Sequence, residues 1–299
     1  VAPSSSHALH MPSHIFAALG MWDDVIKSNQ AAWDIGVKQN VTGDANAFTV
    51  HDMHALQWLA YAHMQKQHYQ TALQLTKKME VIALKSNSAK AKWYYAQMRS
   101  AYLIESGDYG APLKSLPMQH VELSAIADNI YANAMIKRQQ GDIKGMTILL
   151  HELEHSIPTS VPNKTYADYF TSITKSGVET ARIVALEIKA QIAFCERQYN
   201  KGMQYLQKAV KLEDKTSYGY GPPIPVQPSF ELLGGSLVKS KHYKDGFKQF
   251  IVALQRMPNR WLALQGLDVP KRGLWKEGVV IPGVIKPYFH RLILPEFYH

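Results

Sequence analysis

The sequence predicts an all-α fold, an α-solenoid of about six helical hairpins stacked along the chain. Two observations lead to this prediction. Apolar residues recur at helical rather than alternating spacing through most of the 299 residues, as in helices that bury one face. Small and aromatic residues also return in similar order in successive segments, which indicates internal repeats. We expect repeats over residues 1–267 and an irregular tail rich in proline and aromatic residues over 268–299.

The clearest repeat is FELLGGSLVKSKHYKDGFKQFIVALQRMP, at residues 230–258. It matches the tetratricopeptide signature, in which small residues let two helices approach closely and aromatic residues fill the gaps between hairpins. The residues at signature positions are Phe230, Leu233, Gly234, Leu237, Tyr243, Gly246, Phe250, Ala253 and Pro258. The match predicts that the solenoid is built from tetratricopeptide-like hairpins.

Five weaker copies precede this repeat, and one closing helix is expected after it, at residues 259–267. A polar connection at 157–178 and a loop rich in proline and glycine at 213–228 interrupt the series, and the loop cannot be helical. The marker residues of the five copies, in chain order, are Phe16, Gly20, Trp22 and Val25; Leu56, Leu59, Ala60, Tyr69 and Ala72; Gly107, Asp108 and Tyr109; Ala134, Gly141, Asp142 and Ile143; and Ala190, Tyr199, Gly202, Leu206 and Ala209.

The composition excludes several classes of protein. The net charge is +9, but Lys and Arg are scattered, without the basic run interleaved with aromatic residues that marks a nucleic-acid surface, so no nucleic-acid partner is expected. Cys195 is the single cysteine, which excludes an internal disulfide and a cysteine-based zinc site. No apolar run approaches the length of a membrane span. The chain lacks an initiator Met, and we expect it to be a piece of a longer protein.

Histidines cluster in the first repeats. His7, His10 and His14 share one face of a predicted helix, and His51 and His54 open a later one. In the tetratricopeptide register, His7, His10, His14 and His54 fall on positions that line the concave groove. Such a cluster can bind a transition metal, zinc or copper, with Asp52 as a further ligand or as a hydrogen-bond acceptor behind one. The alternative is that the imidazoles bond to one another, to the backbone or to a partner peptide.

The same register predicts a polar and aromatic groove beyond the histidines. Its expected residues are Tyr61, Tyr94, Gln97, Asp128 and Tyr131, with Glu187 and Glu231 further along. Two hypotheses follow. The first is a non-enzymatic scaffold that binds a peptide or protein segment in its groove. The second is a metal-binding protein or metalloenzyme whose site is the histidine cluster, so the sequence leaves enzymatic activity undecided.

A further motif is HELEH at residues 151–155, which matches the HExxH pattern of zinc metalloproteases. Two features argue against that role. Glu154 places a charge inside the motif, and the helix that turns Leu150 and Leu153 inward turns both His151 and His155 outward. Glu179 would be a candidate third ligand. The nucleophile motif GxSxG and the phosphate-binding motifs of P-loops and dinucleotide folds are absent from the sequence.

Three stretches of the sequence resemble a group of mostly bacterial tetratricopeptide-repeat proteins of uncharacterised function. They are HALHMPSHIF-LG-WD at 7–23, DMHALQWLAYA at 52–62, and GPP-P--PSFELLG followed by F--AL-R-PNR at 221–260. The resemblance implies that the chain is the C-terminal part of such a protein and that the protein is exported. The repeated histidines of the group match His7, His10, His14 and His54, with Asp52 beside the last. Members often read PSHEL where this chain has Phe230 and Glu231.

Overall fold

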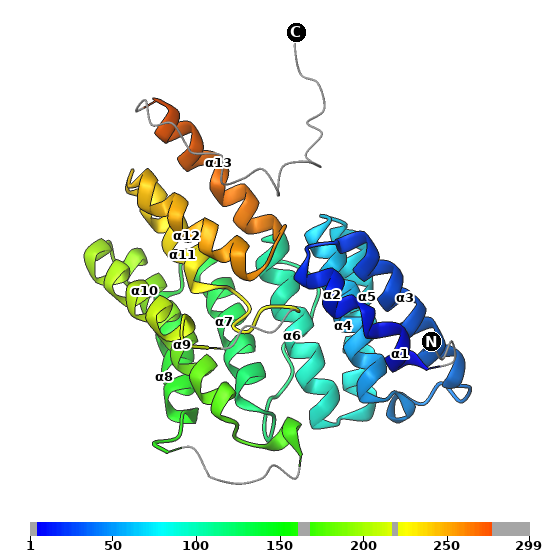
Figure 1. Ribbon diagram of the computed structural model, residues 1–299. Coiled ribbons are helices and arrows are strands. Elements are labelled where there is room, and N and C mark those ends of the chain that lie inside the picture. Colours follow the sequence, from blue (N-terminus) through cyan, green and yellow to red (C-terminus); the bar gives the residue numbers. More distant parts are fainter. Residues whose placement is uncertain (1–4, 161–167, 217–220, 277–299) are drawn as a thin grey trace.

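The predicted all-α class is confirmed. The computed structural model describes residues 5–160, 168–216 and 221–276, and within these ranges it contains thirteen α-helices, two short 3₁₀ helices and no β-strand (Figure 1). None of the helices in these ranges combines the length and the hydrophobicity needed to cross a membrane. The helices are α1 Ser6–His10, α2 Pro12–Ala18, α3 Trp22–Gln39, α4 Val50–Gln65, α5 Tyr69–Ser86, α6 Ala89–Ser106, α7 Leu123–Gln139, α8 Ile143–Ser156, α9 Lys175–Cys195, α10 Tyr199–Glu213, α11 Ser229–Lys239, α12 Tyr243–Arg256 and α13 Trp261–Lys276, with 3₁₀ helices η1 Ala45–Ala47 and η2 Tyr169–Thr171.

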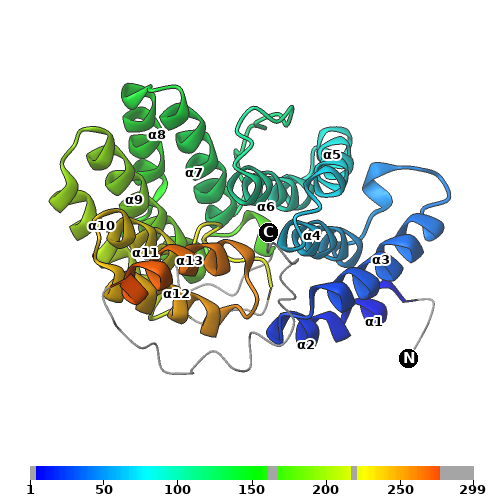
Figure 2. The same ribbon diagram turned by 90° about the horizontal axis from the view of Figure 1, so that it is seen from above.

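Successive helices pack against one another and follow an arc (Figure 2). Helix α4 packs on α3, α5 and α6, and α9 packs on α7, α8 and α10. Small residues occur where helices meet aromatic rings. A methyl group on Gly234 would stand 3.0 Å from the ring of Phe250, so the absence of a side chain permits the close approach of α11 and α12.

The third predicted hairpin lacks its second helix. After α6 the chain runs without helix through residues 107–122, which contain Pro112 and Pro117. Proline removes a backbone donor and clashes with the preceding helical turn, so two prolines in this short segment exclude a helix of normal length. The segment is held by Glu80, whose Oε1 accepts hydrogen bonds from the Lys114 backbone (2.7 Å) and the Tyr95 hydroxyl (3.1 Å).

The predicted boundary at residue 267 is wrong, because α13 continues to Lys276 through Pro270. A proline inside a helix costs about 3 kcal/mol. Here Leu267 and Leu274 are 1% and 3% exposed and Pro270 itself is buried, so the apolar face of α13 continues past the proline and offsets that cost. The rest of the predicted tail, 277–299, lies outside the described residues.

The concave side of the arc is filled by the chain itself. We call residues 221–228 the inner segment; it crosses this side in front of α6 and α7 (Figure 1). The Val226 amide donates to Asp128 Oδ1 on α7 at 2.9 Å. At the start of α11, the Ser229 amide donates to Glu213 Oε2 and its hydroxyl to Glu187 Oε1, both at 2.6 Å. Buried carboxylates therefore satisfy the backbone amides that anchor this segment.

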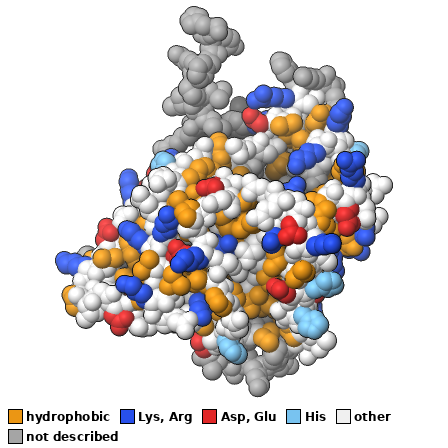
Figure 3. Space-filling view, turned by 180° about the vertical axis from the view of Figure 1, so that it is seen from behind, with side chains coloured by type: hydrophobic (Ala, Val, Ile, Leu, Met, Phe, Trp, Pro, Cys, Tyr) orange, Lys and Arg blue, Asp and Glu red, His pale blue; other side chains and the backbone are white. Residues whose placement is uncertain are grey.

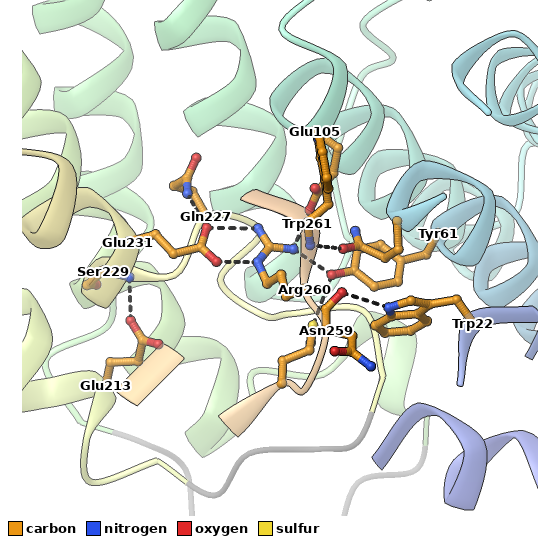
Figure 4. A network of polar contacts seen from close by, with 12 residues as sticks. Trp22, Tyr61, Glu105, Glu213, Gln227, Ser229, Glu231, Asn259, Arg260 and Trp261 are labelled. Atoms are coloured by element: carbon orange, nitrogen blue, oxygen red, sulfur yellow. Dashed lines mark hydrogen bonds and ion pairs between the residues drawn. The ribbon is translucent and has the colours of Figure 1, made fainter. Parts of the chain in front are cut away.

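Arg260, in the turn between α12 and α13, joins distant helices (Figure 4). Its side chain is fully buried and forms ion pairs with Glu105 of α6 and Glu231 of α11. It also donates to the Tyr61 hydroxyl of α4 at 2.5 Å. Tyr61 in turn donates to Met257 Sδ at 3.0 Å. A buried charge requires such compensation, since an unpaired one is strongly unfavourable.

The two ends of the arc meet. The Trp22 indole, at the start of α3, donates to the backbone oxygen of Asn259 at 2.9 Å. The side-chain amide of Asn259, through Nδ2, donates to the backbone oxygen of Gly20 at 3.2 Å. These partners lie more than 230 residues apart in the sequence. The turn between α12 and α13 therefore rests on the turn between α2 and α3, and the helices form a closed ring.

Charged side chains are dispersed on the outside of this ring. On the face shown in Figure 3, Lys and Arg side chains stand apart from one another, with Asp and Glu between them. The positive net charge is therefore spread over that face and does not form a continuous basic patch there.

Candidate metal centre

Three histidines from the N-terminal helices converge. His10 ends α1, His14 lies in α2 and His54 lies in α4. Each residue offers one ring nitrogen, and these three nitrogens all lie within 4.8 Å of one another. His10 Nε2 and His14 Nε2 are 3.1 Å apart. Imidazoles bound to one tetrahedral zinc ion hold their nitrogens about 3.3 Å apart, given a Zn–N length of about 2.0–2.1 Å. We refer to His10, His14 and His54 as the triad.

Local sequence brings these side chains together. Pro12 occupies the first turn of α2 and Met11 keeps helical backbone angles between α1 and α2, so the four-residue spacing of His10 and His14 keeps them on one face. Helix α4 begins in a capping box, in which Thr49 and Asp52 exchange hydrogen bonds. His54 follows within the first turns of that helix, which packs against α1.

Asn29 of α3 fixes the orientation of His10. The Asn29 amide group donates to the Val25 oxygen at 2.8 Å, so its Oδ1 faces His10 Nδ1 at 2.6 Å. An amide oxygen only accepts, and therefore His10 Nδ1 carries the proton and Nε2 carries the lone pair. That lone pair points toward His14. This is the arrangement found behind metal-ligating histidines, whose second nitrogen donates to a fixed acceptor.

The triad is neutral near pH 7. Burial lowers the pKa of His10 to about 4 and the pKa of His54 to about 3, and the charges of neighbouring histidines add to the effect in each. Burial also lowers the pKa of His14. A metal ion needs the unprotonated imidazole. The site therefore presents free ligand nitrogens without first having to lose protons.

A tryptophan and a pocket adjoin the triad. The Trp58 ring centroid lies 4.6 Å from that of His14 and 5.0 Å from that of His10. Beside it is a pocket of about 360 Å³ that His14 and His54 line together with Trp58, Glu179 of α9 and residues 221–224 of the inner segment. A small molecule in this pocket would contact two of the three histidines directly.

His7 and Asp52 do not join the triad. His7 is exposed, and its ring lies against the exposed ring of His51, with centroids 4.2 Å apart. Asp52 is buried, and its Oδ2 accepts from the Thr49 backbone (2.8 Å) and hydroxyl (2.7 Å). Its carboxylate therefore caps α4, and the prediction of Asp52 as a ligand is wrong for this arrangement.

The predicted groove residues are not open to a partner. All seven that we expected to face an open groove are at most 6% exposed: Tyr61, Tyr94, Gln97, Asp128, Tyr131, Glu187 and Glu231. Tyr61 contacts Arg260 and Asp128 contacts the inner segment, whereas Tyr94 packs against Phe170 of η2. Gln97 donates to Asp128 at 2.9 Å, and Asp128 also binds the inner segment. Glu187 is likewise buried against Ser229.

The HELEH motif lies on the outer side of the ring. His151 and His155 are exposed on α8, whereas Leu150 and Leu153 are buried. Glu154 Oε1 pairs with Lys189 Nζ of α9 at 2.5 Å, which neutralises the acid inside the motif. The motif's residues do not take part in the triad, although Glu179, its suggested third ligand, lines the pocket next to it.

Asn29 and Trp58 were not among the site residues expected from the sequence. Asn29 is fully buried in the apolar stripe of α3, with Val25, Ala32 and Trp33. A polar residue within such a stripe signals a specific hydrogen bond, because burying an unpaired amide is unfavourable. Trp58 lies four residues after His54 and so on the same helix face.

Neither a protein-family model nor a curated protein matches the sequence.

Proposed function

We propose that this protein binds a transition-metal ion, zinc or copper, through His10, His14 and His54. The observation that carries the proposal is the convergence of three imidazole nitrogens within 4.8 Å of one another. The hydrogen bond from His10 to Asn29 and the lowered pKa values of all three residues support it. Imidazole ligands favour zinc, copper and nickel over magnesium or calcium, which prefer oxygen.

Three protein ligands next to a pocket are typical of catalytic rather than structural zinc sites, because a fourth position stays open for water or substrate. The pocket beside His14 and His54 would give a small molecule access to the ion. This arrangement favours a metalloenzyme over a purely structural site.

The test is metal binding by protein that carries no histidine tag. Protein freed of metal with a chelator is titrated with Zn²⁺ or Cu²⁺, and bound metal is measured by elemental analysis. We expect one tightly bound equivalent, which His54→Ala abolishes. The matched control is His151→Ala/His155→Ala, which removes two exposed histidines from α8 and should keep the tight equivalent. Less than about a tenth of an equivalent in the wild type would contradict the proposal.

We also propose that the hairpins are of the tetratricopeptide type, as in the bacterial proteins that the sequence resembles. Support comes from Gly202 and Gly234, which lie against the rings of Phe194 and Phe250 at helix crossings. The segment 107–122 departs from the pattern. Helix pairs that superpose with one constant rotation between repeats would support this class, and irregular crossings would contradict it.

A second candidate function, binding of a peptide segment, is favoured by a larger cavity of about 1070 Å³ in the C-terminal half of the ring. Its walls come from α7 and from α9 to α13, and they combine aromatic and aliphatic side chains with Arg138 and Lys239. The two cations favour an acidic peptide. Gly235 lines this cavity, and a side chain there would meet nothing within 4 Å at its first carbon. Peptides selected from a displayed library should therefore bind the wild type and fail to bind Gly235→Leu.

A further inference from the structure

The exposed pair His7 and His51 stands directly outside the triad. Their ring centroids are 4.2 Å apart with an angle of 44° between the planes, and both side chains are exposed. His7 comes from α1 and His51 from α4, the two helices that also supply His10 and His54. This outer pair accounts for the two clustered histidines that the triad does not include.

The four residues form a ladder across the two helices. His7 precedes His10 by three residues and His51 precedes His54 by three residues, so each pair of neighbours lies on one helix face. One rung is His7 with His51 at 4.2 Å, and the next is His10 with His54 at 4.6 Å. Three residues of helix advance about 4.5 Å. The exposed rung is therefore about one helical turn from the buried one.

The two rungs are adjacent along both helices. His10 follows His7 by three residues and His54 follows His51 by three residues, so an ion that leaves the outer pair lies about one helical turn from the ligand nitrogens of the triad.

We propose that His7 and His51 form a second, weaker metal site that loads the triad. Two exposed imidazoles complete their coordination with water, so they bind a transition metal less tightly than three buried ones. The same exposure lets them capture the ion from solution without moving any part of the fold. The carboxylate of Asp52, next to His51, accepts hydrogen bonds from Thr49 at the start of α4. The ligands of the outer site are therefore imidazoles and water. The loading role rests on the proposed function of the triad.

Trp58 provides a local signal for the test. Its ring lies within 5.5 Å of all three triad rings, centroid to centroid. Copper(II) bound there will quench its fluorescence, and a Trp58→Phe variant identifies the part of the signal that arises at this site. Stopped-flow mixing of metal-free protein with Cu²⁺ then gives the rate of loading, and equilibrium competition with a chelator gives the final affinity.

We expect His7→Ala/His51→Ala to load about tenfold more slowly than the wild type, because capture at the outer pair no longer raises the effective concentration of the ion beside the triad. Its final affinity and its quenching amplitude should equal those of the wild type. Two controls should load at the wild-type rate. His151→Ala/His155→Ala removes two exposed histidines elsewhere, and His68→Ala breaks the pair of His63 and His68, whose Nδ1 atoms are 3.3 Å apart at the other end of α4.

The outcomes separate the two proposals. An unchanged loading rate in the double variant, with the tight equivalent intact, overturns the loading role alone. A loss of final affinity in that variant also overturns it, because His7 and His51 would then belong to the triad's own site. Absence of tight copper binding by the wild type overturns the proposed function, and the loading role with it. Circular dichroism of each variant verifies that the helices are unchanged.

Discussion

Gly20 lies so close to Pro258 that a methyl group on its α-carbon would stand 2.5 Å from the Pro258 carbonyl oxygen. The two residues belong to turns at opposite ends of the helical series, and their approach closes the ring. Gly20 also has a φ of +66°, which side-chain-bearing residues adopt only at a cost. Two separate effects therefore require glycine here.

Gly20→Ala should destabilise the protein in two ways that a control can separate. Gly43 has nearly the same φ, +65°, and nothing within 4 Å of the position of a methyl group. Gly43→Ala should lower the free energy of unfolding only by the cost of a positive φ at alanine, about 1–2 kcal/mol. Gly20→Ala should cost a further 1–3 kcal/mol or so for overpacking. Urea unfolding of both variants measures the difference, and equal losses would show that the ring contact contributes nothing.

Arg260→Met should lower the free energy of unfolding by about 3–5 kcal/mol, because it leaves Glu105 and Glu231 buried without their cation. Adding Glu105→Gln and Glu231→Gln to this variant should recover part of the loss. Arg272→Met is the matched control: its pair with Asp268 is exposed on α13 and should contribute less than about 1 kcal/mol. A loss of similar size in both single variants would contradict the role of Arg260.

Asn29→Ala should weaken metal binding about 10–100-fold, since it removes the acceptor that holds His10 in the binding tautomer. Asn29→Asp, which keeps an acceptor at that place, should retain the affinity. Gln30→Ala changes the exposed neighbour on α3 and should have no effect. Competition with a chromogenic chelator measures all three. If Asn29→Ala binds metal as tightly as the wild type, Asn29 does not position His10.

Asp128→Asn should change how stability depends on pH. Burial raises the pKa of Asp128 to about 7, against hydrogen bonds from Val226 and Gln97 that lower it. The folded protein therefore retains a proton that the unfolded chain loses above about pH 4, so this residue reduces stability as the pH rises from about 4 to 7. Asparagine lacks that dependence. The stability of the variant relative to the wild type should therefore increase across this range in urea unfolding experiments, and a constant difference would contradict the shifted pKa.

The helical class and the meeting of the histidines follow from local patterns. Helical spacing places His10 and His14 on one face, and the expected register put His54 on the same side of the repeats, where the structure has it near both. Local rules also determine the cap at Thr49, although Asp52 was expected to be a further metal ligand or a hydrogen-bond acceptor behind one. When an Asp lies three residues after a Thr at the start of a helix, its carboxylate accepts a hydrogen bond from the Thr backbone N–H. The first backbone N–H groups of a helix have no partner within the helix, so this bond takes precedence over binding a metal.

Contacts between residues far apart in the sequence could not be predicted from these local patterns. The register turned Tyr61, Gln97 and Asp128 to the inner side, but nothing in a repeat indicates that residues 221–228 and Arg260 occupy it. These partners lie about 100 to 200 residues away in sequence. The irregular tail was expected to begin at residue 268, whereas α13 continues to Lys276, because the burial of Leu274 that offsets the cost of Pro270 depends on tertiary packing.

The contact of Trp22 with Asn259 has a consequence for how the molecule unfolds. In an open repeat array each unit touches only its neighbours, so terminal units fray and unfolding spreads from the ends in steps. Here the turn before α3 contacts the turn before α13, so neither side of the described helical array can open without breaking contacts between residues more than 230 positions apart. Unfolding should therefore approach a single cooperative transition, and folding should be slow for a helical protein, because its last step joins residues of very large sequence separation.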